Sequence, residues 1–195
     1  MSVIGWGQGR RLAAWVCLAS LAACSTPPPA TYDLGAASDL KAAAGRGTLV
    51  VAEPVAVSFV DSERIPIRTG DNGVAYLPGV QWPDRLPKLF QARLIQSFEN
   101  ARRAGSVGRP GDRLMAANQL NTDIRTFEIR EASGEAVVEV TVRIVNDRSG
   151  RIVAARTFGA RAPAGGFGGP DAARALDQAS RRVLADIVQW TSGRA

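Results

Sequence analysis

The hydrophobic pattern of the chain predicts a sheet of several strands, one helix in the middle and a second helix at the end. Apolar and β-branched residues gather in runs that predict strands at 48–58, 65–77, 120–130, 136–145 and 151–158. Short polar turns separate most of these runs, and the Asn72-Gly73 pair is typical of a tight hairpin. Pro54 limits the first run to an edge, a bulge or a strand end.

The run at 120–130 alternates along its whole length. A regular strand places every second side chain on the same face. The alternation therefore predicts one face carrying Leu120, Ile124 and Glu128 and an opposite face carrying Phe127 and Ile129.

Two segments have the period of an amphipathic helix. The first begins near Asp84, which we expect to cap it, and stops at Gly105, with an apolar stripe of Leu86, Leu89, Phe90, Leu94 and Phe98. The second runs from about Pro170 to Thr191 with a stripe of Leu176, Ala179, Val183, Leu184, Ile187 and Trp190, and Gly193 suits its end. Residues 105–113 and 159–170 are expected as loops. The pattern predicts a single α+β domain, a mostly antiparallel sheet covered by two amphipathic helices.

The first 23 residues have the pattern of a signal peptide. Arg10 and Arg11 precede an apolar run at 12–23 that is too short to cross a bilayer. The run ends in Leu-Ala-Ala-Cys, which reads as a lipobox with cleavage between Ala23 and Cys24 and acylation of Cys24. Two acyl chains on a diacylglyceryl thioether and one on the amine would give a durable membrane anchor. The alternative is an ordinary cleaved signal with an incidental cysteine.

Residues 24–47 are expected to be a proline-rich tether between the acylated cysteine and a folded domain at 48–195. Consecutive prolines favour an extended spacer. Within it, Tyr32 and Leu34 share one side of an extended segment and could pair with the domain. Ser25 stands where an aspartate would resemble an inner-membrane retention signal, so the resemblance to sorting signals favours the outer membrane, on its periplasmic side.

Composition removes several classes of function. The chain has no histidine, which excludes Ser-His-Asp and Cys-His catalysis and the commonest zinc ligand. Removing the leader with its two arginines lowers the formal net charge from +6 to +4, and the remaining excess is not clustered. We therefore expect no catalytic residues, no metal, no cofactor and no nucleic-acid partner.

Two further positions have alternative interpretations. Phe167 stands in a glycine cluster that lacks the lysine and spacing of a phosphate loop, so it is either part of a linker or an exposed apolar tip that meets a partner or lipid. Trp82 lies among three prolines and is either a core residue or a platform for a ligand. Together with Tyr32, these are the candidate partner or lipid contacts.

The chain resembles the ABC-type transport auxiliary lipoprotein family. The matching parts are the lipobox at Cys24, Tyr32-Asp33-Leu34, the strand at 49–57, the hairpin ending near Trp82, Pro83 and Leu86, the strand at 137–145, the turn at 147–150 and the helix at 172–190. The resemblance implies a non-enzymatic lipoprotein that faces the periplasm and docks to an MCE-domain (mammalian-cell-entry) protein. It also implies permease and ATPase partners, lipid carriage between the two membranes, and in some members a homo-oligomeric ring.

Two rival functions stay open at this point. One is an outer-membrane lipoprotein that binds lipid or lipopolysaccharide in its own cavity, independently of an ABC system. The other is a membrane-anchored periplasmic hydrolase, against which the missing histidine argues.

Overall fold

A computed structural model describes residues 27–38, 40, 47–101, 106–192 and 194. Its strands are β1 (Ala30–Thr31), β2 (Thr48–Val51), β3 (Val55–Ala56), β4 (Arg64–Arg68), β5 (Val74–Gln81), β6 (Ser106–Gly108), β7 (Asn118–Arg130), β8 (Glu135–Asn146) and β9 (Ile152–Pro163). Its helices are η2, a single 3-10 turn (Gly70–Asn72), α2 (Leu86–Asn100) and α3 (Gly169–Thr191).

β7 is the central strand of the sheet. β8 pairs antiparallel with its whole length and β9 pairs antiparallel with β8, which forms a meander of three long strands. On the other side of β7, the short strands β2, β3 and β4 pair in parallel with successive stretches of it. β4 and β5 form the predicted hairpin. The sheet is mostly antiparallel with some parallel pairs, and the predicted α+β class is confirmed.

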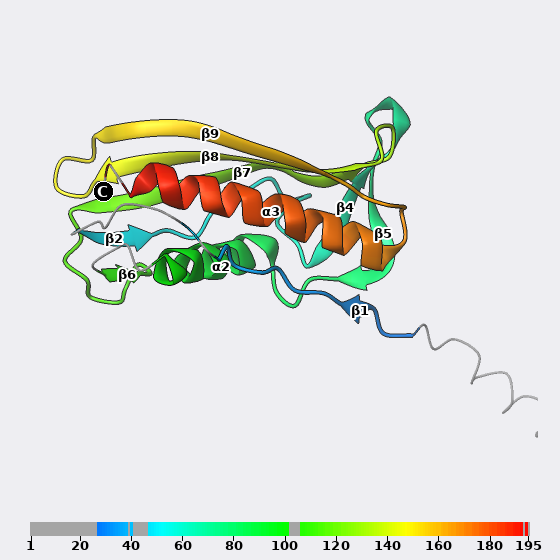
Figure 1. The fold of residues 1–195 in the computed structure, drawn as a ribbon, viewed down its shortest axis with the longest axis horizontal. Coiled ribbons are helices and arrows are strands. Elements are labelled where there is room, and N and C mark those ends of the chain that lie inside the picture. Colours follow the sequence, from blue (N-terminus) through cyan, green and yellow to red (C-terminus); the bar gives the residue numbers. More distant parts are fainter. Residues whose placement is uncertain (1–26, 39, 41–46, 102–105, 193, 195) are drawn as a thin grey trace, which may run out of the picture.

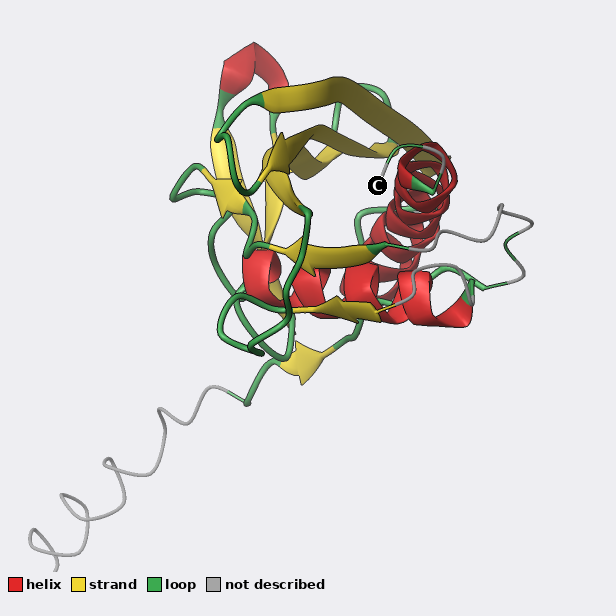
Figure 2. Cartoon of the chain, turned by 90° about the vertical axis from the view of Figure 1, so that its left-hand side faces the viewer, coloured by secondary structure: helices red, strands yellow, loops and turns green. Residues whose placement is uncertain are grey.

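Both helices lie on the concave side of the curved sheet (Figures 1 and 2), α3 packing against β8 and β9 and also against α2. Every residue of the two predicted apolar stripes is buried, so the helical period identified the covered face correctly. The predicted N-cap is wrong. Arg85 occupies the N-cap position without a side-chain cap bond, because the Asp84 carboxylate accepts from the Arg85 N–H and pairs with Lys88 instead. Gly105 and Gly193, the expected helix stops, lie outside the described residues.

The predicted faces of β7 are wrong in its second half. The register against β8 shifts between Ile124 and Thr126, so one extra residue, Arg125, is inserted there. Such a bulge reverses the alternation beyond it. Leu120 and Ile124 are buried in the core before the bulge, and Phe127 and Ile129 are buried in the core after it. Glu128 is thereby displaced to the face of the sheet turned away from the core.

Two predicted loops are shorter than expected. Residues 106–108 form β6, which pairs in parallel with β2. β9 continues to Pro163, because β8 offers pairing partners as far as Glu135. The glycine-rich loop before α3 is therefore reduced to residues 164–168, which we call the Phe167 loop.

Candidate functional site

The predicted anchor lies outside the described residues, which begin at Pro27. Cleavage after Ala23 and acylation of Cys24 therefore stay predictions. The geometry nevertheless limits where an anchor would act. Ala30, the first residue of β1, is six residues beyond Cys24, a stretch that spans at most about 20 Å.

Residues 30–38, which we call the strap, pack against the folded body. β1 pairs in parallel with β5, with Ala30 beside Val80 and Thr31 beside Gln81. The Tyr32 N–H then donates to the Gln81 carbonyl at 2.9 Å. The Tyr32 ring is partly buried against the core, so its predicted pairing with the domain is seen and only part of the ring is accessible. This part of the expected tether is not a free spacer.

Beyond Tyr32 the strap is bound to both helices. Asp33 forms an ion pair with Arg93 of α2, and that hydrogen bond holds the pKa of the Asp33 carboxyl below its ordinary value of 3.8. The Gly35 N–H donates to Asp177 Oδ1 of α3 at 2.6 Å. Between them Leu34 is 2% exposed and belongs to the core. The strap is thus held by backbone pairing, charge and apolar burial together.

The end of the strap is fixed to α2 by two further hydrogen bonds. The Ala37 N–H donates to Ser97 Oγ at 2.9 Å, and Asn100 Nδ2 donates to the Ala37 carbonyl at 3.1 Å. Ser97 is itself fully buried. The polar side chains of Ser97 and Asn100 on α2 therefore supply hydrogen-bond partners for the backbone of the strap.

The structure corrects one candidate contact. Trp82 is 0% exposed and packs edge-on against Phe127, with ring centroids 6.0 Å apart. It directly follows β5, and its backbone N–H donates to the Glu63 carbonyl at 2.7 Å. A side chain with no exposed surface offers nothing to a partner or a lipid. Trp82 is a core residue.

Phe167 is exposed, with 45% of its surface accessible. The loop that carries it is fixed at both ends. The Ala164 N–H donates to the Gly134 carbonyl in the β7–β8 turn at 2.8 Å, and Gly169 at the start of α3 is pressed against Val80 of β5. Gly165 and Gly166 have positive φ angles of 65° and 152°, which an L side chain rarely adopts. The loop therefore presents Phe167 from a fixed base.

A buried carboxylate lies on the face of the sheet turned away from the core. Glu128 is 2% exposed and accepts two hydrogen bonds from Arg68 of β4, each at 2.8 Å. Arg130 Nε donates to the same carboxylate at 3.2 Å. The Glu128 bond raises the pKa of Arg68. Sequence reasoning missed this cluster, because a bulge that reverses the strand leaves no signal in the alternation.

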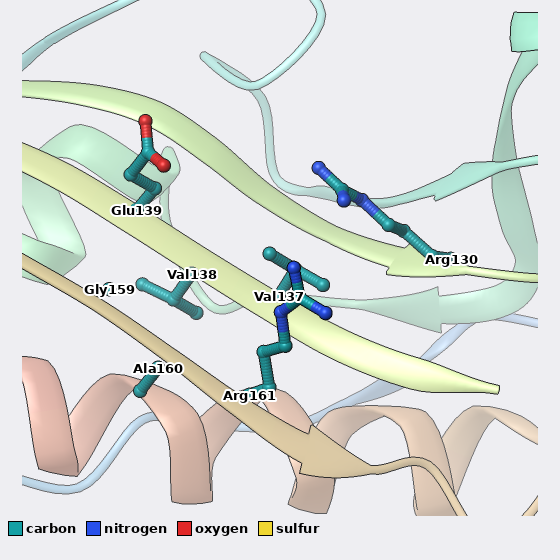
Figure 3. A pocket seen from close by; sticks show the side chains of 7 residues that line it. All are labelled: Arg130, Val137, Val138, Glu139, Gly159, Ala160 and Arg161. Carbon is teal, nitrogen blue, oxygen red and sulfur yellow. The ribbon is translucent and has the colours of Figure 1, made fainter. Parts of the chain in front are cut away.

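Beside this cluster the sheet carries a hollow of about 450 Å³ (Figure 3). Its charged lining residues are Arg130, Glu139 and Arg161, and the others are Val137, Val138, Gly159 and Ala160. Two further hollows, of about 370 and 610 Å³, also carry at least two charged residues each. None of the three resembles the mainly apolar pocket in which an acyl chain would be buried.

Over the described part of the chain, no group of three residues could hold a metal ion. The same residues contain no helix long and apolar enough to span a membrane.

Comparisons with known proteins found one curated relative and several similar folds. A protein from Bradyrhizobium diazoefficiens, itself of uncharacterised function, is 37% identical over 169 residues, which is 83% of this chain and 44% of that protein. The chain thus spans less than half the length of that relative. A crystal structure of a Xanthomonas campestris protein shares the fold with a TM-score of 0.75 at 24% identity, covering 84% of this chain and 95% of that one. A hypothetical protein from Chlamydia trachomatis has a TM-score of 0.52 at 10% identity, covering 75% and 96%.

The sequence profile of the ABC-type transport auxiliary lipoprotein component matches residues 32–188. The matched region begins in the strap at Tyr32, includes the whole sheet from β2 to β9, and ends near the end of α3. The family is described by an auxiliary role in transport and is not a known enzyme family. The chain belongs to the ABC-type transport auxiliary lipoprotein family.

Proposed function

We propose that this protein is the outer-membrane lipoprotein of an ABC transport system of the MCE type and helps carry lipid between the inner and outer membranes. The observation that carries the proposal is the family match, which covers nearly the whole described body. In this role the protein is acylated at Cys24, faces the periplasm and acts by contact with an MCE-domain protein and its permease and ATPase subunits.

The surface is compatible with docking rather than with carriage of lipid inside the domain. The core is filled by interlocking side chains from the sheet and both helices. The hollow in Figure 3 has charged lining residues and is suited to polar contacts with another protein. We favour the docking function over the lipid-binding rival because the family is described by an auxiliary role in transport.

A pull-down tests the proposed partners. The full chain with a C-terminal tag is recovered from envelopes solubilised in mild detergent, and co-purified proteins are identified by mass spectrometry. We expect an MCE-domain protein with a permease and an ATPase. Recovery of none of these, from a bait shown to be membrane-bound, would refute the proposal. Stoichiometric lipid on the purified bait in native mass spectrometry would favour the lipid-binding rival instead.

The anchor is tested separately with Cys24→Ser. We expect this variant to accumulate as the uncleaved precursor, because lipoprotein processing requires the cysteine thiol to be acylated first. The intact mass of the wild-type protein should show loss of residues 1–23 and a gain of acyl mass. Cleavage of the Cys24→Ser variant at the normal site would contradict the assignment, since it would mean that an ordinary signal peptidase acts there.

A further inference from the structure

The strap limits which end of the body can face the membrane, provided that Cys24 carries the acyl anchor of the proposed function. Because β1 is paired with β5 from Ala30 onward, only five residues separate the sheet from Cys24. Such a stretch reaches at most about 20 Å. Whatever path it takes, Ala30 lies within that distance of the acylated cysteine.

The Phe167 loop lies at the end of the body where β1 pairs with β5. Ala30 is the backbone neighbour of Val80, at the roughly 4.8 Å spacing of paired strands. Gly169 lies against the side chain of the same Val80, so close that a Cβ on Gly169 would be 2.1 Å from Val80 Cγ1. Phe167 is two residues before Gly169. Val80 of β5 therefore contacts both Ala30, where the strap begins, and Gly169, where the Phe167 loop ends.

The loop has the chemistry of a membrane contact. Phe167 is the one aromatic residue among the large hydrophobic side chains that the described residues expose; the others are Val55, Val57, Val74, Met115, Ile152 and Val153. The nearest carboxylate, Asp171, is paired with Arg174 and leaves no uncompensated negative charge beside the loop. An aromatic ring presented on a neutral, glycine-rich loop suits the interface between lipid headgroups and acyl chains.

The opposite end of the molecule is far from the tether. β9 runs from Ile152 to Pro163, so its two ends are about 36 Å apart. Figure 1 shows β1, β5 and the start of α3 together at the right-hand end, with the start of β9 at the other. Ile152 is 59% exposed and supplies a matched exposed apolar position there.

We infer that the Phe167 loop is the surface on which the body rests against the bilayer that holds its acyl chains. The occupant is the lipid surface itself, because the short tether keeps this end within reach of it. The anchor and the loop then act as two contacts, which hold the body in one orientation and leave its far end free.

A fluorescent reporter at position 167 tests this orientation. Cys17 leaves with the leader and the Cys24 thiol is acylated, so a new cysteine is the single free thiol of the mature chain. Acylated full-length Phe167→Cys and Ile152→Cys proteins are labelled with an environment-sensitive dye. Each is placed in vesicles of phosphatidylethanolamine and phosphatidylglycerol with and without spin-labelled lipid. We expect blue-shifted emission at 167 and quenching several-fold stronger than at 152.

The outcomes separate the inference from its foundation. Flotation of the labelled protein with the vesicles, together with an intact mass that includes the acyl chains, establishes the anchor. Flotation with equal quenching at the two positions, or with none at 167, overturns the inference alone. A blue shift without quenching that grows with the protein-to-lipid ratio would identify a second copy as the occupant and also overturn it. Failure to float would refute the anchor and the inference together.

Discussion

Replacing Gly169 by alanine tests the contact that joins the start of α3 to β5. In the structure a Cβ at this position would be 2.1 Å from Val80 Cγ1 and 3.1 Å from its Cβ and Cγ2. Carbon atoms in normal contact are about 3.5–4.0 Å apart, so helix and strand would have to separate by roughly 1.5 Å. Val80 is not free to withdraw, because its backbone is paired with Ala30 of the strap.

The size of the effect follows from two opposing contributions. Forcing an extra methyl group into a packed contact costs about 1–3 kcal/mol. Alanine in place of glycine in a helix returns at most about 1 kcal/mol, and less in the first turn. We expect Gly169→Ala to lower the free energy of unfolding by about 1–2 kcal/mol. For a protein of this length that lowers Tm by about 2–8 °C.

Gly159→Ala is the matched control. Gly159 lies in β9 without a positive φ, and the nearest atom to its missing Cβ is the Val138 carbonyl oxygen at 3.6 Å, an ordinary contact. Removing the extra freedom of glycine in the unfolded chain should therefore leave stability unchanged or raise it by about 0.5–1 kcal/mol. Thermal and urea unfolding, followed by circular dichroism, would measure both variants.

A second-site change identifies the cause. Val80→Ala removes the methyl groups that the new Cβ would meet, so adding Gly169→Ala to it should cost much less than in the wild type. If the two substitutions instead change the free energy of unfolding additively, the clash with Val80 is not the cause of the destabilisation. Gly169→Ala with wild-type stability would show that α3 does not begin against β5 as described.

Two further variants test the strap and the buried carboxylate. The hydrogen bond from Arg93 lowers the pKa of the Asp33 carboxyl in the folded state below its ordinary value of 3.8. The ion pair therefore stabilises the docked strap at pH values above 3.8, and this stabilisation is lost as the pH falls through the lowered pKa. Asp33→Asn should therefore lower the hydrogen-exchange protection of the Gly35 amide, which donates to Asp177, at neutral pH, and equal protection in both proteins would contradict this. Glu128→Gln leaves Arg68 without its counter-ion and should lower the free energy of unfolding by about 1–3 kcal/mol; an unchanged urea midpoint would argue against it.

The elements with a local period could be predicted from the sequence. The stripe from Leu176 to Trp190 repeats every three or four residues, and a helix of that period has one face to bury whatever it packs against. The long strands β7 and β8 could likewise be found from their composition and the turns between them. These patterns show which face of each element must be covered by other parts of the protein. The helices and the meander were therefore located correctly.

The bulge in β7 had no such local signal. A register shift depends on how two strands twist against one another, and Arg125 is as suitable in a regular strand as in a bulge. The shift decides that Phe127 enters the core and that Glu128 leaves it for the two arginines. An error of one residue in register thus hid the buried ion cluster.

The strap was hidden for another reason. Its contacts join residues that are far apart in the sequence: the Gly35 N–H meets Asp177 across 142 positions, and Asp33 meets Arg93 across 60. Apart from Tyr32 and Leu34, the segment that follows the three prolines consists of small and polar residues, as a linker does. Only the partners supplied by α2 and α3 distinguish the two.

The docked strap changes what an anchor at Cys24 would do. A free spacer from Cys24 to Thr48 has 24 residues and could place the body up to about 80 Å from the lipid in any orientation. With β1 paired to β5, Ala30 is six positions beyond Cys24, and this stretch spans at most about 20 Å, less than the roughly 36 Å length of β9. Because the stretch from Cys24 to Ala30 is shorter than the body, the end of the body at β1 can reach the membrane more easily than the end at the start of β9. The same contacts that bury Leu34 therefore favour one orientation, with the Phe167 loop toward the lipid and the start of β9 toward the periplasm.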